Sequence, residues 1–167
     1  MTTLFLANQF LIFCFFAMII FAAINDVSRF CIPNAVSLGL IILYPLHVLV
    51  SPVPIDWLRS LMMAGVVFGA GFVLFSRGLM GGGDVKLLTA AALWAGGGLL
   101  LPLLVVMGLV GGVLAALAWL LQYARRYRAG GIAGLLMHDP AIAAPKVPYG
   151  VAIAAGAGYA GIKLLAS

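Results

Sequence analysis

The sequence predicts an all-α protein, a polytopic membrane helix bundle with about six transmembrane helices in a single domain over residues 1–167. Hydrophobic residues make up 65% of the chain and charged residues only 8%. The mean hydropathy of +1.24 lies far above the value of a soluble globular domain. Nine Lys and Arg with four acidic residues cannot cover the surface of a soluble protein, so we expect the lipid bilayer to cover the rest.

Six apolar runs have the character of bilayer-crossing helices, which need about 20 residues at a rise of 1.5 Å each. We expect these helices at residues 4–24, 35–50, 58–75, 85–95, 99–122 and 147–165. The first run has a rival interpretation as a signal peptide, but no Lys or Arg precedes Arg29 to form the basic start of one. Only Gly96–Gly98 separate the fourth run from the fifth, so these two could form a tight hairpin.

Basic residues near helix ends predict the orientation, because Lys and Arg favour the cytoplasmic side of the inner membrane. With the N-terminus outside, only Arg59 and Lys163 lie outside. Both termini are then outside, and the polar connection at residues 123–146 is cytoplasmic. The basic residues are too scattered for a nucleic-acid partner. The basic residues expected on the cytoplasmic side are Arg29, Arg77, Lys86, Arg125, Arg126, Arg128 and Lys146.

No metal site and no cofactor are predicted. His47 and His138 fall on opposite sides of the membrane, and zinc needs at least three protein ligands. Cys14 and Cys31 are expected to be unpaired, reduced thiols. Three stripes of small residues should let helices pack closely in lipid. They are Gly65 with Gly69, Gly108 with Gly112, and Gly150 with Ala154 and Gly158.

The four aspartates fall into two groups. Asp56 and Asp139 lie in loops beside prolines, where a carboxylate commonly makes a turn or a cap. Asp26 ends the first apolar run and Asp84 begins the fourth, so both are expected at the cytoplasmic boundary of the bilayer. Each could cap a helix, and Asp26 could pair with Arg29. However, ionisable residues at membrane depth are costly and usually functional, and two at one depth can meet when their helices pack.

Two neighbouring carboxylates can activate water, because both cannot ionise easily and one therefore keeps a proton. The ionised group takes a proton from the attacking water, and its partner protonates the peptide carbonyl oxygen and later the leaving amine. The roles of the two groups stay open, because coupled groups titrate as a unit. Glycine at positions 81 and 83 would leave room for a peptide beside Asp84 and would permit unusual dihedral angles. Two other functions stay open: a proton-coupled or ion-coupled transporter component, and a non-catalytic assembly subunit.

The segment GGGDVKLL at residues 81–88 resembles the GxGDxKL signature of the type IV prepilin peptidases, membrane aspartic proteases of the GxGD class. DVSRFCIPN at residues 26–34 is similar to the first-Asp element of that family, and VPYGVAIAAG at residues 147–156 to its closing helix. The resemblance implies that Asp26 and Asp84 are the catalytic pair. It also implies cleavage of prepilins at the cytoplasmic face, between a short basic leader that ends in glycine and a hydrophobic helix.

Two features refine the resemblance. Asn25 precedes Asp26, whereas the presenilin and signal-peptide-peptidase group carries a Tyr-Asp element. The cysteine-motif domain of longer family members is missing between the first two apolar runs. The chain therefore resembles the short form of tight-adherence systems, which act on small Flp-type pilins, and we do not expect N-methyltransferase activity. No oligomeric state is predicted.

Overall fold

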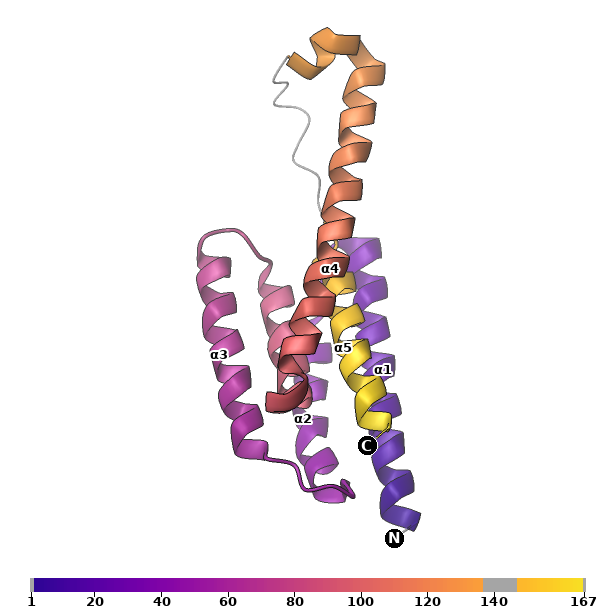
Figure 1. The fold of residues 1–167 in the computed structure, drawn as a ribbon, viewed down its shortest axis with the longest axis vertical. Helices are drawn as coiled ribbons and strands as arrows, with labels where there is room; N and C mark the ends of the chain where they lie inside the picture. Colours follow the sequence, from indigo (N-terminus) through magenta and orange to yellow (C-terminus); the bar gives the residue numbers. More distant parts are fainter. Residues whose placement is uncertain (1, 137–146, 167) are drawn as a thin grey trace.

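The computed structural model describes residues 2–136 and 147–166, and these residues are helical or lie in short connections. Figure 1 shows the helices side by side, with the chain termini at one end of the bundle and the extended part of α4 at the other. The described residues contain no strand, so the all-α prediction is confirmed. The helices are α1 (Thr2–Arg29), α2 (Asn34–Val50), α3 (Trp57–Ser76), α4 (Gly82–Leu136) and α5 (Tyr149–Leu165).

Several of these helices are long and apolar enough to cross a membrane. Among the described residues, three stretches meet both conditions: most of α1, all of α3, and residues Gly82–Arg125 of α4. The shorter apolar helices are α2 and α5. Large apolar side chains also face outward, such as Phe10, which is 66% exposed. Together these features suggest a membrane protein, whereas six separate transmembrane helices are not confirmed.

The expected fourth and fifth helices form one element, α4, which reverses its direction at Gly96. This residue has a φ of +57°, a left-handed conformation that glycine adopts without the steric cost of a side chain. Figure 1 shows the ribbon of α4 running toward the end with the termini and then back. We call residues 82–95 the short arm of α4 and residues 97–136 its long arm.

The long arm extends beyond the end that the sequence predicted for the fifth helix. It continues to Leu136, so the first part of the predicted polar connection at residues 123–146 is helical. His138, Asp139 and Lys146 lie outside the described residues.

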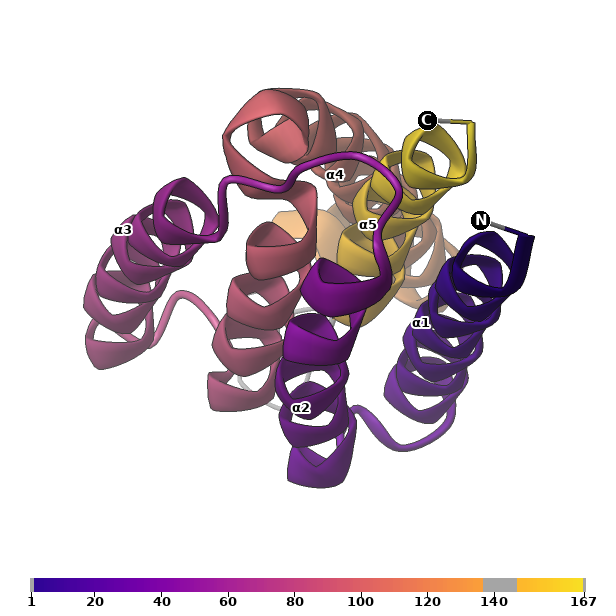
Figure 2. The same ribbon diagram turned by 90° about the horizontal axis from the view of Figure 1, so that it is seen from below.

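The two arms of α4 pack on different helices. In the short arm, the indole N–H of Trp94 donates to the carbonyl oxygen of Leu40 in α2 at 2.9 Å, and its ring stacks on His47 at 4.8 Å. The long arm contacts α5, where Gly156 lies against the backbone of Leu103. Figure 2, viewed along the bundle, shows α4 between α3 and α5, and α1 packs on α5 and on α2. The start of α4 lies at the same end of the bundle as the C-terminal ends of α1 and α3.

Most of the predicted small-residue stripes do not mediate packing between the described helices. A Cβ atom at five of these glycines would meet no neighbouring atom within 4 Å. The expectation of close packing is therefore wrong for these five positions within the chain. They are Gly65, Gly69, Gly108, Gly112 and Gly158.

Candidate active site

Asp84 lies in the first turn of α4, at the end of the bundle away from the termini. The N–H of Val85 donates to the carbonyl oxygen of Gly81 at 3.1 Å and closes this turn. The Asp84 carboxylate accepts a hydrogen bond from the backbone of Gly81, which satisfies a donor that the helix leaves free and is favoured by the helix dipole. Asp84 is therefore not the N-cap residue itself, although its side chain serves the same helix end.

The glycines before Asp84 keep space open around the carboxylate. A Cβ at Gly81 would lie 2.8 Å from Oδ2 of Asp84, and one at Gly83 would lie 3.2 Å from Cβ of Ile32. Neither glycine has a positive φ; near this site that conformation occurs at Gly78, with φ +71°. The expectation that Gly81 and Gly83 supply unusual dihedral angles is therefore wrong, because the chain makes its left-handed turn earlier, just after α3.

Asp26 lies in the last turn of α1 and is buried, with 6% of its surface exposed. Its Oδ2 accepts a hydrogen bond from the backbone N–H of Gly150, in the first turn of α5, at 2.7 Å. The first N–H groups of a helix lack intrahelical partners and carry partial positive charge, so this contact stabilises the ionised carboxylate. A Cβ at Gly150 would lie 2.8 Å from Oδ2 and 2.9 Å from Cβ and Cγ of Asp26, so a larger residue would not fit without movement.

The end of α1 turns the chain from Asp26 toward Asp84. Phe30 has a φ of +49°, a conformation that costs a residue with a side chain about 1–2 kcal/mol. Its N–H donates to the carbonyl oxygen of Asp26 at 2.8 Å, which closes the last turn of the helix. The following loop, residues 31–33, passes over the glycines before Asp84, where Ile32 faces Gly83.

Asp26 and Asp84 line one pocket of about 480 Å³. The two carboxylates are close enough for an electrostatic interaction between them. The structure thus brings together the two acidic residues that the sequence singles out, although they belong to different helices. The rest of the pocket comes from the loop after α1, the start of α2 and the glycine turn: Phe30, Cys31, Ile32, Pro33, Asn34, Gly81, Gly82 and Gly83.

Two contacts of this region have no counterpart in the sequence-based prediction. Lys86 donates from Nζ to Oδ1 of Asn34 at 3.0 Å and joins the start of α4 to the start of α2 at the rim of the pocket. Gly150 packs closely against α1, as the small-residue stripe predicts, and its N–H also holds Asp26, which was not expected. A small residue in the PYG segment at the start of an apolar helix was the available signal, because free N–H groups occur at such positions.

Of the other acidic, cysteine and histidine residues that the structure describes, only Cys31 lines the pocket with the two aspartates. Asp56 is the N-cap of α3, and its Oδ1 accepts from the N–H of Arg59 at 3.0 Å, so its predicted structural role is confirmed. Cys14 and Cys31 are both free, as expected, and Cys31 lines the pocket. His47 is buried beside Asn8, with 2.7 Å between Nδ1 and Oδ1. In the described part of the chain, no group of three or more His, Cys, Asp or Glu residues could hold a metal ion.

Comparison with known proteins gives one match. A model described as the type IV leader peptidase family matches residues 12–117, which is more than half of the chain and includes both pocket aspartates. No curated protein and no solved structure matches the chain.

Proposed function

This chain belongs to the type IV leader peptidase family, and we propose that it removes the leader peptide from type IV prepilins with water activated between Asp26 and Asp84. One observation carries the proposal: two carboxylates from separate helices line a single pocket. An apolar chain tolerates such a pair only at a cost, which supports a functional role for it. The three glycines beside Asp84 leave room for the backbone of a peptide substrate.

The proposed reaction uses the pair as one unit. One carboxylate is ionised and takes a proton from the water that attacks the scissile carbonyl carbon. Its protonated partner donates to the carbonyl oxygen and takes a proton back from the resulting gem-diol. The partner then gives this proton to the leaving amine as the C–N bond breaks, so that the pair again holds one proton, the one taken from water. The hydrogen bonds from Gly150 to Asp26 and from Gly81 to Asp84 would hold the carboxylates in position through these steps.

We further propose that the pocket opens at the cytoplasmic face of the inner membrane. Arg29 and Lys86 lie in the ends of α1 and α4 that carry the two aspartates, Arg77 directly follows α3, and basic residues favour the cytoplasmic side. Both chain termini would then lie outside. The two arms of α4 would each cross the bilayer, and with the other four helices they would make six crossings.

The proposed substrates are the small Flp-like pilins of tight-adherence systems. Only a short connection, residues 30–33, joins α1 to α2, which leaves no room for the cysteine-motif domain of longer relatives. The same short connection supports a peptidase without N-methyltransferase activity. The cleavage site would follow a glycine and precede the hydrophobic helix of the pilin.

Substitution of each pocket aspartate tests the proposal. We expect Asp26→Asn or Asp84→Asn to abolish processing of a co-expressed prepilin, measured by its shift in gel mobility, while the chain stays in the membrane fraction. Asp56→Asn is the matched control, because asparagine caps a helix as well as aspartate does and Asp56 lies outside the pocket. Processing that persists in both pocket variants would reject the peptidase.

The same variants address the transporter alternative. Both aspartates lie at an end of the bundle, whereas carboxylates that bind transported ions more often lie near the bilayer midplane. A defect in ion flux across liposomes, without any defect in prepilin processing, would favour the transporter over the peptidase.

A further inference from the structure

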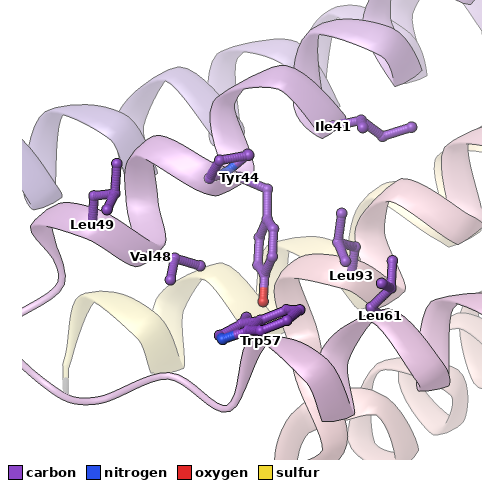
Figure 3. Close-up of a pocket in the computed structure, with 8 residues that line it drawn as sticks. Ile41, Tyr44, Val48, Leu49, Trp57, Leu61 and Leu93 are labelled. Atoms are coloured by element: carbon purple, nitrogen blue, oxygen red, sulfur yellow. The ribbon is translucent and has the colours of Figure 1, made fainter.

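An apolar groove lies between α2 and α3, with the short arm of α4 as its floor. It consists of two adjoining pockets of about 460 and 380 Å³, which share Ile41, Leu61 and Leu93. Tyr44 and Thr89 add polar atoms to an otherwise largely apolar lining. Figure 3 shows the larger pocket, with side chains from α2, α3 and the short arm of α4 around it.

The groove and the pocket that contains the two aspartates follow one another along α2, although no residue lines both of them. On α2, the residues that line the successive pockets run from Asn34 at the aspartate pocket through Ile41 to Val48. This distance is about 21 Å, the length of roughly fourteen helical residues. On the short arm, Thr89 of the groove lies only about 8 Å along the helix from Asp84. Residues at seven-residue intervals on one face of α2 therefore line first the aspartate pocket and then the groove, toward the opposite end of the bundle.

The α3 wall of the groove has space for the backbone of another helix. Gly65 lines the smaller pocket, and a Cβ at Gly65, or at Gly69 one turn further along, would meet no neighbouring atom within 4 Å. Small residues in a membrane let a second helix approach closely.

One buried polar group, the hydroxyl of Tyr44, lies on the α2 wall of the groove. Tyr44 is 6% exposed, and its hydroxyl lies near the side chain of Ser60 in α3 without a hydrogen bond of good geometry. Figure 3 shows this hydroxyl pointing across the pocket toward Trp57.

We propose that this groove binds the hydrophobic helix that follows the cleavage site of the prepilin. The inference rests on the proposed function. A peptide segment in lipid must satisfy its own backbone hydrogen bonds, so the occupant is a helix, and the apolar walls require apolar side chains on it. With this helix in the groove, the bond at its N-terminal end lies beside Asp26 and Asp84. The groove thus contributes affinity for the pilin part of the substrate rather than for the leader.

Filling the groove tests the proposal. Gly65→Phe and Gly69→Phe add a large side chain where the chain itself has open space, and Gly108→Phe is the matched control on the long arm, where space is also open. Each full-length variant in liposomes receives two substrates: the whole prepilin, and a peptide truncated just after the cleavage site. The measured quantity is the ratio of kcat/KM for the prepilin to kcat/KM for the peptide.

The groove variants should lower this ratio by about tenfold or more, the discrimination that a change of shape in an apolar pocket can produce. Gly108→Phe should keep the ratio of the unmodified protein. An unchanged ratio in both groove variants would overturn the groove proposal while leaving the peptidase intact. If the unmodified protein cleaves neither substrate, the proposed function fails first and the groove proposal with it.

Crosslinking gives a second measurement that does not depend on turnover. A photoreactive residue at Leu61, in a chain that also carries Asp84→Asn, should crosslink to the hydrophobic helix of the prepilin. The same residue at Leu109, exposed on the long arm, should not. Crosslinks from Leu61 only to lipid, or only to a second copy of the chain, would assign the groove to that occupant and overturn the proposal.

Discussion

Replacement of Gly150 by alanine is the sharpest perturbation of the pocket, because it changes one methyl group and touches neither carboxylate. The added Cβ would lie 2.8 Å from Oδ2 of Asp26, whereas ordinary contacts begin at 3.4 Å. The difference, 3.4 minus 2.8, requires a movement of 0.6 Å. Asp26 is buried at the end of α1, so the shift must lengthen or break its 2.7 Å hydrogen bond to the N–H of residue 150.

The size of the effect follows from this hydrogen bond. A hydrogen bond to a charged group contributes about 1.5–3 kcal/mol. At about 1.4 kcal/mol for each factor of ten in rate, its loss in the reacting complex would lower kcat/KM by about 10- to 150-fold. The helix itself should not suffer, because alanine is a better helix former than glycine.

The assay compares cleavage of the prepilin by Gly150→Ala and by Gly158→Ala in the same liposomes. Gly158 lies in the same helix, and a Cβ there would meet no neighbouring atom within 4 Å, so this control should keep the activity of the unmodified protein. Cleavage by Gly150→Ala within threefold of the control would refute the reasoning that the α5 N-terminus holds Asp26.

Two further predictions concern the turn of α4 and the thiol in the pocket. Gly96→Ala should lower the unfolding temperature in detergent, because left-handed alanine costs about 1–2 kcal/mol and its Cβ would lie 2.8 Å from Oγ of Ser60. Gly98→Ala is the control and should keep the unfolding temperature, because space is open there. Equal unfolding temperatures for the two variants would contradict this prediction. Alkylation with a bulky maleimide should stop prepilin cleavage through Cys31, which lines the pocket. Cys31→Ser should be resistant, whereas inhibition that persists in it would point to Cys14 or to an indirect effect.

The composition of the chain was sufficient to predict its helices, because a long apolar run in lipid has few alternatives to a helix. The second helix, predicted at residues 35–50, is Asn34–Val50, and the third, predicted at residues 58–75, is Trp57–Ser76. The sequence did not decide between two separate helices and a tight hairpin around Gly96, since glycine both permits a turn and occurs inside membrane helices. The extension to Leu136 was missed because a polar segment can continue a helix as well as end it.

The candidate site was predictable only in part. Asp26 and Asp84 stand out because carboxylates are rare in such an apolar sequence, and the local motif around each one can be recognised without a structure. For the support of Asp26 by Gly150, the sequence signals only a helix start at the PYG segment, and it does not say which side chain the free N–H group there would hold. The same holds for the contact between Lys86 and Asn34, which depends on how two helix starts face each other.

The reversal of α4 also couples the angle between its two arms to the position of Asp84. Asp84 lies at the tip of the short arm, about 18 Å from Gly96 at 1.5 Å per residue, while the long arm packs on α5, whose first turn holds Asp26. Each degree by which the angle between the arms opens would move Asp84 by about 0.3 Å relative to that first turn. A change of conformation at Gly96, at the opposite end of the molecule, would therefore alter the spacing of the two acids.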